Sequence, residues 1–460
     1  MAALPSTYTE GTLPHLPPET HDHILDYLQF DCAALKSCSL TCRAWLSTAR
    51  HHLFRTISVS ITDIQPLLHV IETSTVLVHH IRALAVRVND VNISLLYSGL
   101  LRLLACLDAV ECVTLQQPID TGKVSERDVM IVRPWEAGPC VGVTRLVIEP
   151  NCTFERSDLF PFLAFFPRLS TLHVSDLSLR SQRLVQVQTH LPAGSTPFLA
   201  AARKPQISTL TWTHDRHDMN LVWMAFVTND ELPTWPTDGG PLDFSSLSTL
   251  EVRMRGFRVW PTLRTLLHTS GAALRRLVLS LANDLAGYDR HPQSIDLSHN
   301  VDLEELHIKD ILLNSQFPLR LVCAILGQIA SPLAGVDADD GDGDGEEYYH
   351  VQLRSIVLEL CGPDKHTVPN IPDNLNWDQL DPQLARILRL NEKVVVTFRV
   401  PAMLASLHAA VFTRNLPEVM RMVRSVEGAR RVKVVPVWMH RSSPLPWEIE
   451  TSEGQEEWLV

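Results

Sequence analysis

One pattern recurs along most of this 460-residue chain and constrains its fold more than any other feature. An apolar residue is followed by two residues of any kind, a second apolar residue, one further residue and a third apolar residue. Short apolar segments of this kind predict β-strands that each bury one face. The units are Ile81, Leu84, Val86; Val110, Val113, Leu115; Val143, Leu146, Ile148; Leu169, Leu172, Val174; Ile207, Leu210, Trp212; Leu247, Leu250, Val252; Leu274, Leu277, Leu279; Leu303, Leu306, Ile308; and Leu353, Ile356, Leu358.

The spacing of these units indicates what joins the strands. Their middle residues lie 26 to 50 positions apart, and the gaps of 26 to 29 fit one strand, one turn and one helix. Helices are predicted between strands at residues 156–165 and 260–270. The alternation resembles an irregular leucine-rich-repeat solenoid, an α/β array with a parallel sheet, in which the longer gaps are insertions. The asparagine that usually follows the strand in such repeats is mostly missing here.

The C-terminal part of the chain continues this alternation. Residues 394–400 and 432–438 each predict a strand. Residues 403–426 predict a helical stretch that is broken near Pro417. We expect this region to cap the open end of the array.

Charge is concentrated in two segments rather than spread along the chain. Residues 337–347 contain seven carboxylates and residues 448–460 contain five, and neither segment has a Lys or Arg. The remaining 40 acidic residues balance the 40 Lys and Arg residues, so the folded body is neutral. A neutral body argues against nucleic acid as a partner.

The segment from about residue 12 to residue 54 has a helical pattern instead. Pro17 and Pro18 stand where a helix begins, a place that tolerates a missing amide proton. Asp31 is placed to cap a second helix. The apolar positions are Ile24, Leu25 and Leu28 in the first helix, Leu35, Cys38, Cys42 and Trp45 in the second, and Leu53 and Phe54 in a third short helix.

The same segment holds a fixed order of residue types: Leu16, Pro17, Glu19, Ile24, Leu25, Leu28, Asp31, Leu35, Cys38, Ser39, Leu40, Cys42, Arg43, Trp45, Leu53 and Phe54. This order resembles an F-box of the kind abundant in mushroom-forming fungi. The resemblance implies a three-helix module that docks on a Skp-type adaptor, which in turn binds a cullin scaffold carrying the ubiquitin-transfer machinery. A segment of about forty residues also has more apolar surface than it buries alone, which fits completion of its core against a partner. Thr20 departs from the family, which usually has an aliphatic residue there.

The resemblance also implies which side chains matter. Ten of them form either the core of the module or its adaptor-facing surface, and the sequence does not separate these two roles. They are Leu16, Pro17, Ile24, Leu25, Leu28, Leu35, Leu40, Cys42, Trp45 and Leu53.

We therefore expect an N-terminal three-helix F-box followed by a leucine-rich-repeat-like α/β solenoid. The divisions are a flexible N-terminus at 1–11, the F-box at 12–55, the solenoid at 56–440 with an acidic loop at 336–349, and an acidic tail at 441–460. The 45% hydrophobic and 20% charged fractions suit such a folded, soluble protein.

The expected function is that of a substrate-receptor subunit in a cullin-type ubiquitin ligase. In this reading the chain is not an enzyme, needs no cofactor or metal, and recruits an unknown protein target through the repeat surface. Two alternatives stay open. One is an F-box scaffold or sensor that acts without ubiquitin transfer, and the other is an enzyme in the C-terminal half that no recognisable motif reveals.

The sequence also favours a cytoplasmic or nuclear protein without a membrane partner. The longest apolar stretch, 321–334, falls short of the roughly 20 residues that a membrane-spanning helix needs. Residues 1–11 lack the basic start and apolar run of a secretory signal. Nine cysteines, one of them necessarily unpaired, suit a reducing compartment.

One cysteine cluster suggests metal binding. Cys38 and Cys42 have a spacing that a zinc site allows, and Cys32, His51 and His52 lie near them in the sequence. No second ligand pair follows at a suitable distance along the chain. We favour buried thiols on an apolar helix face.

One acidic cluster suggests calcium binding. Asp340, Asp342, Asp344 and Gly345 imitate the first half of an EF-hand loop, but Val351 stands at the twelfth position, where a bidentate Glu is required. A solvated acidic loop explains the cluster better.

Overall fold

The structure is a computed structural model in which the chain divides into two units, Met1–Val143 and Thr144–Val460. The acidic loop at 336–349 and most of the helical stretch at 403–426 lie outside the described residues, as do residues 1–16. The described residues are 17–88, 93–116, 139–150, 152–155, 159, 162–175, 178–180, 204–213, 242–254, 260–281, 295–312, 316–331, 350, 352–361, 377–401, 421–424, 431–437 and 458–459.

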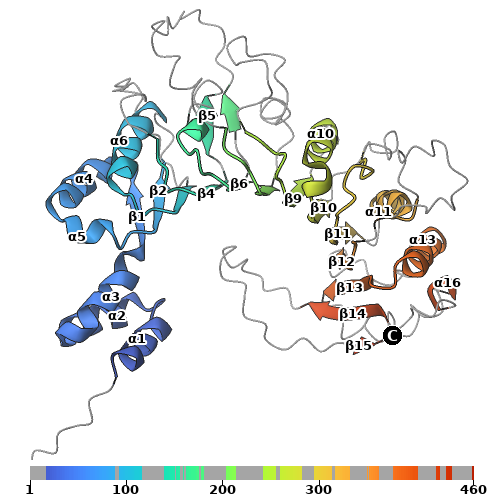
Figure 1. The fold of residues 1–460 in the computed structure, drawn as a ribbon, viewed down its shortest axis with the longest axis horizontal. Coiled ribbons are helices and arrows are strands. Elements are labelled where there is room, and N and C mark those ends of the chain that lie inside the picture. The colour runs from blue at the N-terminus through green and yellow to red at the C-terminus, as the bar shows by residue number, and fades with distance from the viewer. Residues whose placement is uncertain are drawn as a thin grey trace, which may run out of the picture. The chain divides into compact units, whose positions relative to one another are not determined.

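Unit 1 begins with three helices and continues with alternating strands and helices (Figure 1). Its three strands β1, β2 and β3 pair in parallel, with Ile57 opposite Leu84 and Leu84 opposite Val113. The elements are α1 Pro18–Tyr27, α2 Cys32–Thr41, α3 Arg43–Arg55, β1 Thr56–Ser60, the 3₁₀-helix η1 Ile61–Asp63, α4 Ile64–Thr73, α5 Thr75–Val78, β2 Ala83–Arg87, α6 Ile93–Cys106 and β3 Cys112–Gln116.

The prediction of one second helix through Leu35, Cys38, Cys42 and Trp45 is wrong. Helix α2 ends at Thr41, the backbone of Cys42 is extended with φ −153° and ψ 162°, and α3 contains both Trp45 and Leu53. A straight helix would place Trp45 about 15 Å along its axis from Leu35, too far to share a core with it. The break at Cys42 lets α3 turn back, so that the helices can enclose one core.

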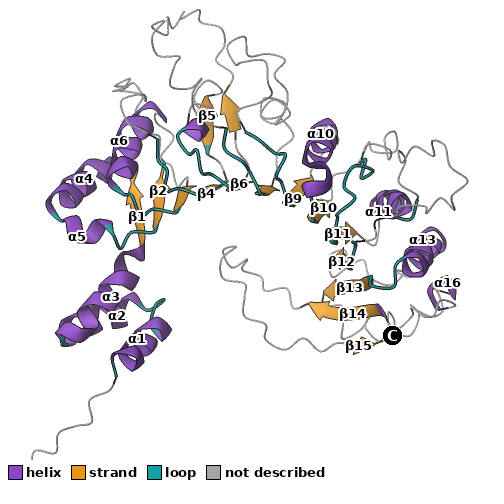
Figure 2. Cartoon of the chain, in the orientation of Figure 1, coloured by secondary structure: helices purple, strands orange, loops and turns teal. Residues whose placement is uncertain are grey.

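Nine strands of unit 2 pair in parallel with one another among its described residues. Figure 2 shows α10, α11 and α13 on the same side of these strands. No helix of the described part is long and apolar enough to cross a membrane. The elements are β4 Arg145–Ile148, β5 Thr153–Glu155, β6 Thr171–Ser175, β7 Ser178–Arg180, β8 Thr209–Thr213, β9 Thr249–Met254, α10 Trp260–Ser270, η4 Gly271–Ala273, β10 Arg276–Leu281, β11 Glu305–Leu312, α11 Gln316–Ile329, β12 Ser355–Cys361, α13 Trp377–Leu390, β13 Val395–Pro401, α16 Arg421–Arg424, β14 Val432–Val437 and β15 Trp458–Leu459.

The repeating apolar pattern predicts the core residue by residue. Every residue of the nine units is at most 2% exposed. The middle residues stand opposite one another in the sheet of unit 2, so that they form one apolar column across the strands. This column is Leu146, Leu172, Leu210, Leu250, Leu277, Leu306, Ile356, Val396 and Val432. The fold is therefore the expected α/β, solenoid-like array with a parallel sheet.

The remaining expectations about elements have mixed outcomes. The helix at 260–270 and the strands near 394–400 and 432–438 are confirmed as α10, β13 and β14. The helix at 156–165 lies mostly outside the described residues. Strand β1 was not predicted, and neither were the small sheet of β5 and β7 or the antiparallel pairing of β15 with β14.

A row of polar side chains joins the turns that precede the strands of unit 2. Asn300 is fully buried, and its Nδ2 donates to the carbonyl oxygens of Leu267 and Gly271, each at 2.9 Å. His350 donates from Nδ1 to the carbonyl of Asn300 at 3.1 Å, and Nδ2 of Asn391 donates to the carbonyl of Leu353 at 2.9 Å. These bonds add side-chain donors to backbone carbonyls of neighbouring repeats, some of which also accept from Ser270 and Leu274.

Replacing Asn300 with Ala should lower the free energy of unfolding by about 1–3 kcal/mol, because two hydrogen bonds of a fully buried side chain are lost. Urea denaturation of the full chain measures the change. Asp302→Ala is the matched control, since this side chain is exposed in the same turn, and it should change the unfolding free energy by less than about 0.5 kcal/mol. Equal effects of the two substitutions would contradict a stabilising role for Asn300.

Candidate interaction surface

The first two helices begin as the sequence indicates. Pro17 is the N-cap of α1, and its carbonyl accepts hydrogen bonds from the amides of Thr20 at 3.0 Å and His21 at 3.3 Å. Asp31 caps α2, because its Oδ1 accepts from the amides of Ala33 at 3.0 Å and Ala34 at 2.9 Å. The cap predicted at Asp31 is therefore confirmed, and it fixes where the chain turns from α1 into α2.

The three helices enclose a small core of their own. Leu25, Leu35 and Ala49 are fully buried, and Cys38 is buried with them. Three partly buried side chains, Leu28, Trp45 and Leu53, pack against this core. Burying one leucine stabilises a fold by about 1.5–3 kcal/mol, so a core of this size leaves little surplus stability.

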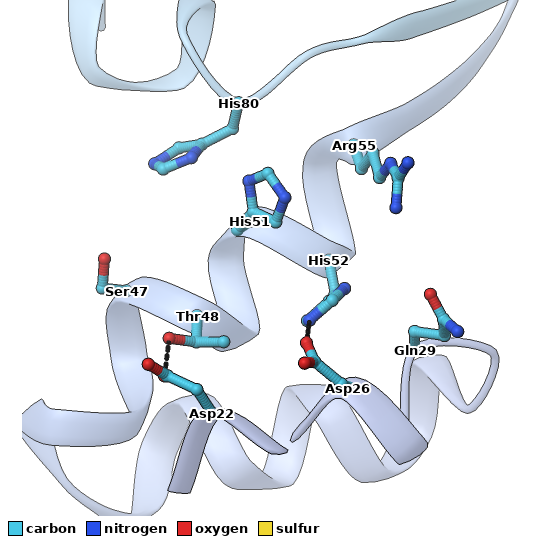
Figure 3. Close-up of a pocket in the computed structure, with 9 residues that line it drawn as sticks. All are labelled: Asp22, Asp26, Gln29, Ser47, Thr48, His51, His52, Arg55 and His80. Carbon is cyan, nitrogen blue, oxygen red and sulfur yellow. Dashed lines mark hydrogen bonds and ion pairs between the residues drawn. The ribbon is translucent and has the colours of Figure 1, made fainter. Parts of the chain in front are cut away.

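Polar contacts join α1 to α3 beside this core, as Figure 3 shows. The hydroxyl of Thr48 donates to Oδ1 of Asp22 at 2.6 Å, and Nε2 of His52 lies 2.9 Å from Oδ1 of Asp26. The side chain of His52 is almost completely buried. These contacts fix the relative orientation of α1 and α3.

Several large apolar side chains of the same helices remain uncovered. Leu40 is 88% exposed, Phe30 87%, Tyr27 79% and Ile24 38%. Of the eight large exposed hydrophobic side chains among the described residues, these four fall within residues 24–40. Four exposed large apolar side chains within one short segment make this part of the three-helix module a candidate surface for contact with another protein. We call these four residues the exposed apolar set.

The structure separates the ten predicted site residues, which the sequence alone did not. Leu16 lies outside the described residues. Tyr27 and Phe30 of the exposed apolar set were missed, because neither stands at a position that the resemblance to the F-box marks. Leu25 and Leu35 are core residues, Leu28, Trp45 and Leu53 pack against the core, and Pro17, Ile24, Leu40 and Cys42 are exposed.

The cysteines of this region are not grouped as metal ligands in the part of the chain that the structure describes. No group of three or more His, Cys, Asp and Glu side chains in that part of the chain is placed to hold a metal ion. Cys38 is buried as expected, but Cys42 is exposed because it lies in the extended break between α2 and α3. The expectation of two buried thiols is therefore wrong for Cys42.

Comparison with known proteins now adds to this geometry. Residues 13–60 match the model of the F-box-like family, a match that covers α1, α2, α3 and β1. No curated protein matches the chain. The chain therefore contains an F-box-like domain at residues 13–60, and F-box domains generally bind Skp-type adaptors.

Proposed function

We propose that this chain is a substrate-receptor subunit of a cullin-type ubiquitin ligase. The observation that carries the proposal is the exposed apolar set, because it lies within the segment that matches the F-box-like family. In this function the set docks on a Skp-type adaptor, and the adaptor links the chain to a cullin scaffold. Burying an exposed apolar side chain stabilises a complex by roughly 1.5–3 kcal/mol before the costs of association.

We assign recruitment of the target protein to the repeats of unit 2. The face of strands β9 to β12 that lies opposite the leucine column carries polar and charged side chains. Lys309 Nζ lies 2.8 Å from Glu251 Oε1, and His307 Nε2 donates to Glu359 at 3.2 Å. Burial lowers the pKa of His307, so it is neutral at physiological pH, whereas its hydrogen bond lowers the pKa of Glu359, which stays ionised.

One residue of this face has an unusual backbone. Asp310 has φ 58°, at a bulge between Ile308 and Ile311 in the pairing of β11 with β12. Its carboxylate accepts hydrogen bonds from the hydroxyl of Ser280 and the thiol of Cys361, which lie on the two neighbouring strands. A left-handed non-glycine residue persists only where its surroundings hold it, and such residues concentrate at functional sites. This feature supports the assignment of target binding to this face.

In the proposed function the chain is not catalytic and needs no cofactor, because the ubiquitin-transfer chemistry belongs to other subunits. Its place of action is the cytoplasm, the nucleus or both. The rival hypothesis is an F-box scaffold or sensor that binds the adaptor without ubiquitin transfer. The two hypotheses differ in whether a cullin joins the complex.

Co-elution of purified components tests the proposal. The full chain, a Skp-type adaptor and a cullin are mixed and separated by size exclusion, with each pair run alone as a control. We expect all three proteins in one peak, and no binding of the chain to cullin when the adaptor is omitted. A stable complex of chain and adaptor that leaves the cullin behind would overturn the receptor function in favour of the scaffold.

A further inference from the structure

A polar cavity of about 690 Å³ lies in unit 1 where α3 approaches the segment before β2 (Figure 3). Helix α1 contributes Asp22 and Asp26 to its lining, and α3 contributes His51, His52 and Arg55. His80 lines it from the segment that leads into β2. The cavity therefore adjoins both the F-box-like domain and the first strands of the repeats.

The two sides of this cavity are held by different kinds of contact. On the α1 side, Asp22 accepts a hydrogen bond from Thr48, and Asp26 is paired with His52. On the side toward β2, the ring of His51 meets the ring of His80 edge-on, with centroids 6.0 Å apart. His52 has a carboxylate beside it, whereas the contact of His51 with His80 brings two imidazoles together.

The backbone joins the same two parts without a linker. Helix α3 ends at Arg55 and β1 begins at Thr56. The amide of Arg82, at the entrance to β2, donates to the carbonyl of Arg55 at 2.9 Å. We call this hydrogen bond, together with the contact of His51 with His80, the junction.

The groups whose charge shifts the pKa of His51 are all basic, and the carboxylates of Asp22 and Asp26, which line the same cavity, are bonded to Thr48 and His52. Burial is the main cause that lowers the pKa of His51, and the positive charges of His52, Arg55, His80 and Arg82 lower it further. The guanidinium of Arg82 is itself 3.1 Å from Glu111, and His79 beside His80 lies 3.9 Å from Asp108, so these carboxylates pair with other groups. Protonation of His51 is therefore unfavourable while the junction is closed.

We propose that the junction is a pH-sensitive hinge, in which protonation of His51 separates the paired strands β1 and β2 from the three helices while α1 and α3 stay together. The direction of the pH effect follows from the difference between the pKa of His51 in the open state and its pKa in the closed state. The closed state is the one in which the junction is formed, and in the open state both of its contacts are broken. In the open state His51 is hydrated and has its usual pKa near 6.5, which is higher than its pKa in the closed state. The closed state is fully favoured above that pH, and it loses stability as the pH falls below it.

Hydrogen exchange of the full chain at pH 7.5 and pH 5.5 tests the proposal, with rates corrected for the intrinsic effect of pH. Protection of the Arg82 amide should fall by as much as about tenfold per pH unit for each proton taken up. Amides of α1 and α3 should keep their protection. His51→Gln should remove the pH dependence at Arg82, and His69→Gln, on the exposed side of α4, should leave it unchanged.

Each other outcome counts against the proposal. Equal protection of the Arg82 amide at the two pH values would overturn it, and so would equal loss throughout α1 and α3. If His51→Gln already weakens the junction at pH 7.5, NMR titration of the histidines in the native chain decides. A His51 that titrates at or above pH 6.5 would then overturn the hinge.

Discussion

Replacing both Phe30 and Leu40 with Ser should weaken adaptor binding by at least about 100-fold while leaving the fold intact. Both side chains are almost fully exposed, so their removal takes nothing from the core. Surface substitutions of this kind usually change stability by less than about 0.5 kcal/mol. An apolar side chain that anchors an interface contributes about 2 kcal/mol or more, which is roughly 30-fold in Kd for each residue.

Calorimetric titration of a Skp-type adaptor into the native and double-variant chains measures this effect, and thermal melting checks that both are folded. Val70→Ser is the matched control. This valine is also an exposed apolar residue, 45% accessible, but it lies on α4 outside residues 13–60. A folded double variant with the native Kd would show that the exposed apolar set is not the adaptor-binding surface.

Leu28 and Trp45 are poor choices for such a test, although the sequence places them among the site residues. Both pack against the core of the three helices, so their truncation leaves cavities as well as removing surface. A loss of binding in those variants would not distinguish a damaged interface from an unfolded module. The exposure of each side chain, which only the structure supplies, separates the two cases.

The repeat core was predictable because one physical constraint fixes it. Side chains of a strand alternate between two faces, and the described helices α10, α11 and α13 pack on the same side of the strands, so the apolar residues recur at set positions. Leu250, Leu277 and Leu306 were placed correctly for that reason, and they stand opposite one another in neighbouring strands. Strand β1 escaped notice although Phe54, Ile57 and Val59 repeat the pattern, because Phe54 also fits the end of α3.

The helical module was less predictable, because its periodicity runs through a break in the backbone. Cys38, Cys42 and Trp45 keep spacings of three and four across the extended residue that separates α2 from α3. The division into core and surface was also hidden. Leu35 and Leu40 belong to the same helix and are the same residue type, yet only the packing of the other helices makes one buried and the other exposed. The junction of His51 with His80 joins residues 29 positions apart, which no local pattern indicates.

The same pair of leucines gives the second prediction. Leu35→Ala should destabilise the three-helix module by about 2–4 kcal/mol, because it removes a fully buried side chain and leaves a cavity. Leu40→Ala, on the same helix, should cost less than about 0.5 kcal/mol. Hydrogen exchange of the amides in residues 18–55 measures both changes locally, without interference from unfolding of unit 2. Similar protection in the two variants would show that Leu35 does not hold the module together.

The two leucines should also differ in how they affect adaptor binding. If the adaptor binds only the folded module, the apparent Kd equals the intrinsic Kd divided by the fraction of molecules in which the module is folded. Leu35→Ala then raises the apparent Kd only because it lowers this folded fraction. Excess adaptor should then restore native protection from exchange in that variant, because binding shifts the equilibrium toward the folded state. Leu40→Ala is folded from the start, so its weaker binding reflects lost contacts that no folding equilibrium restores. A Leu35→Ala variant that stays unprotected at saturating adaptor would show that the adaptor binds without the folded three-helix core.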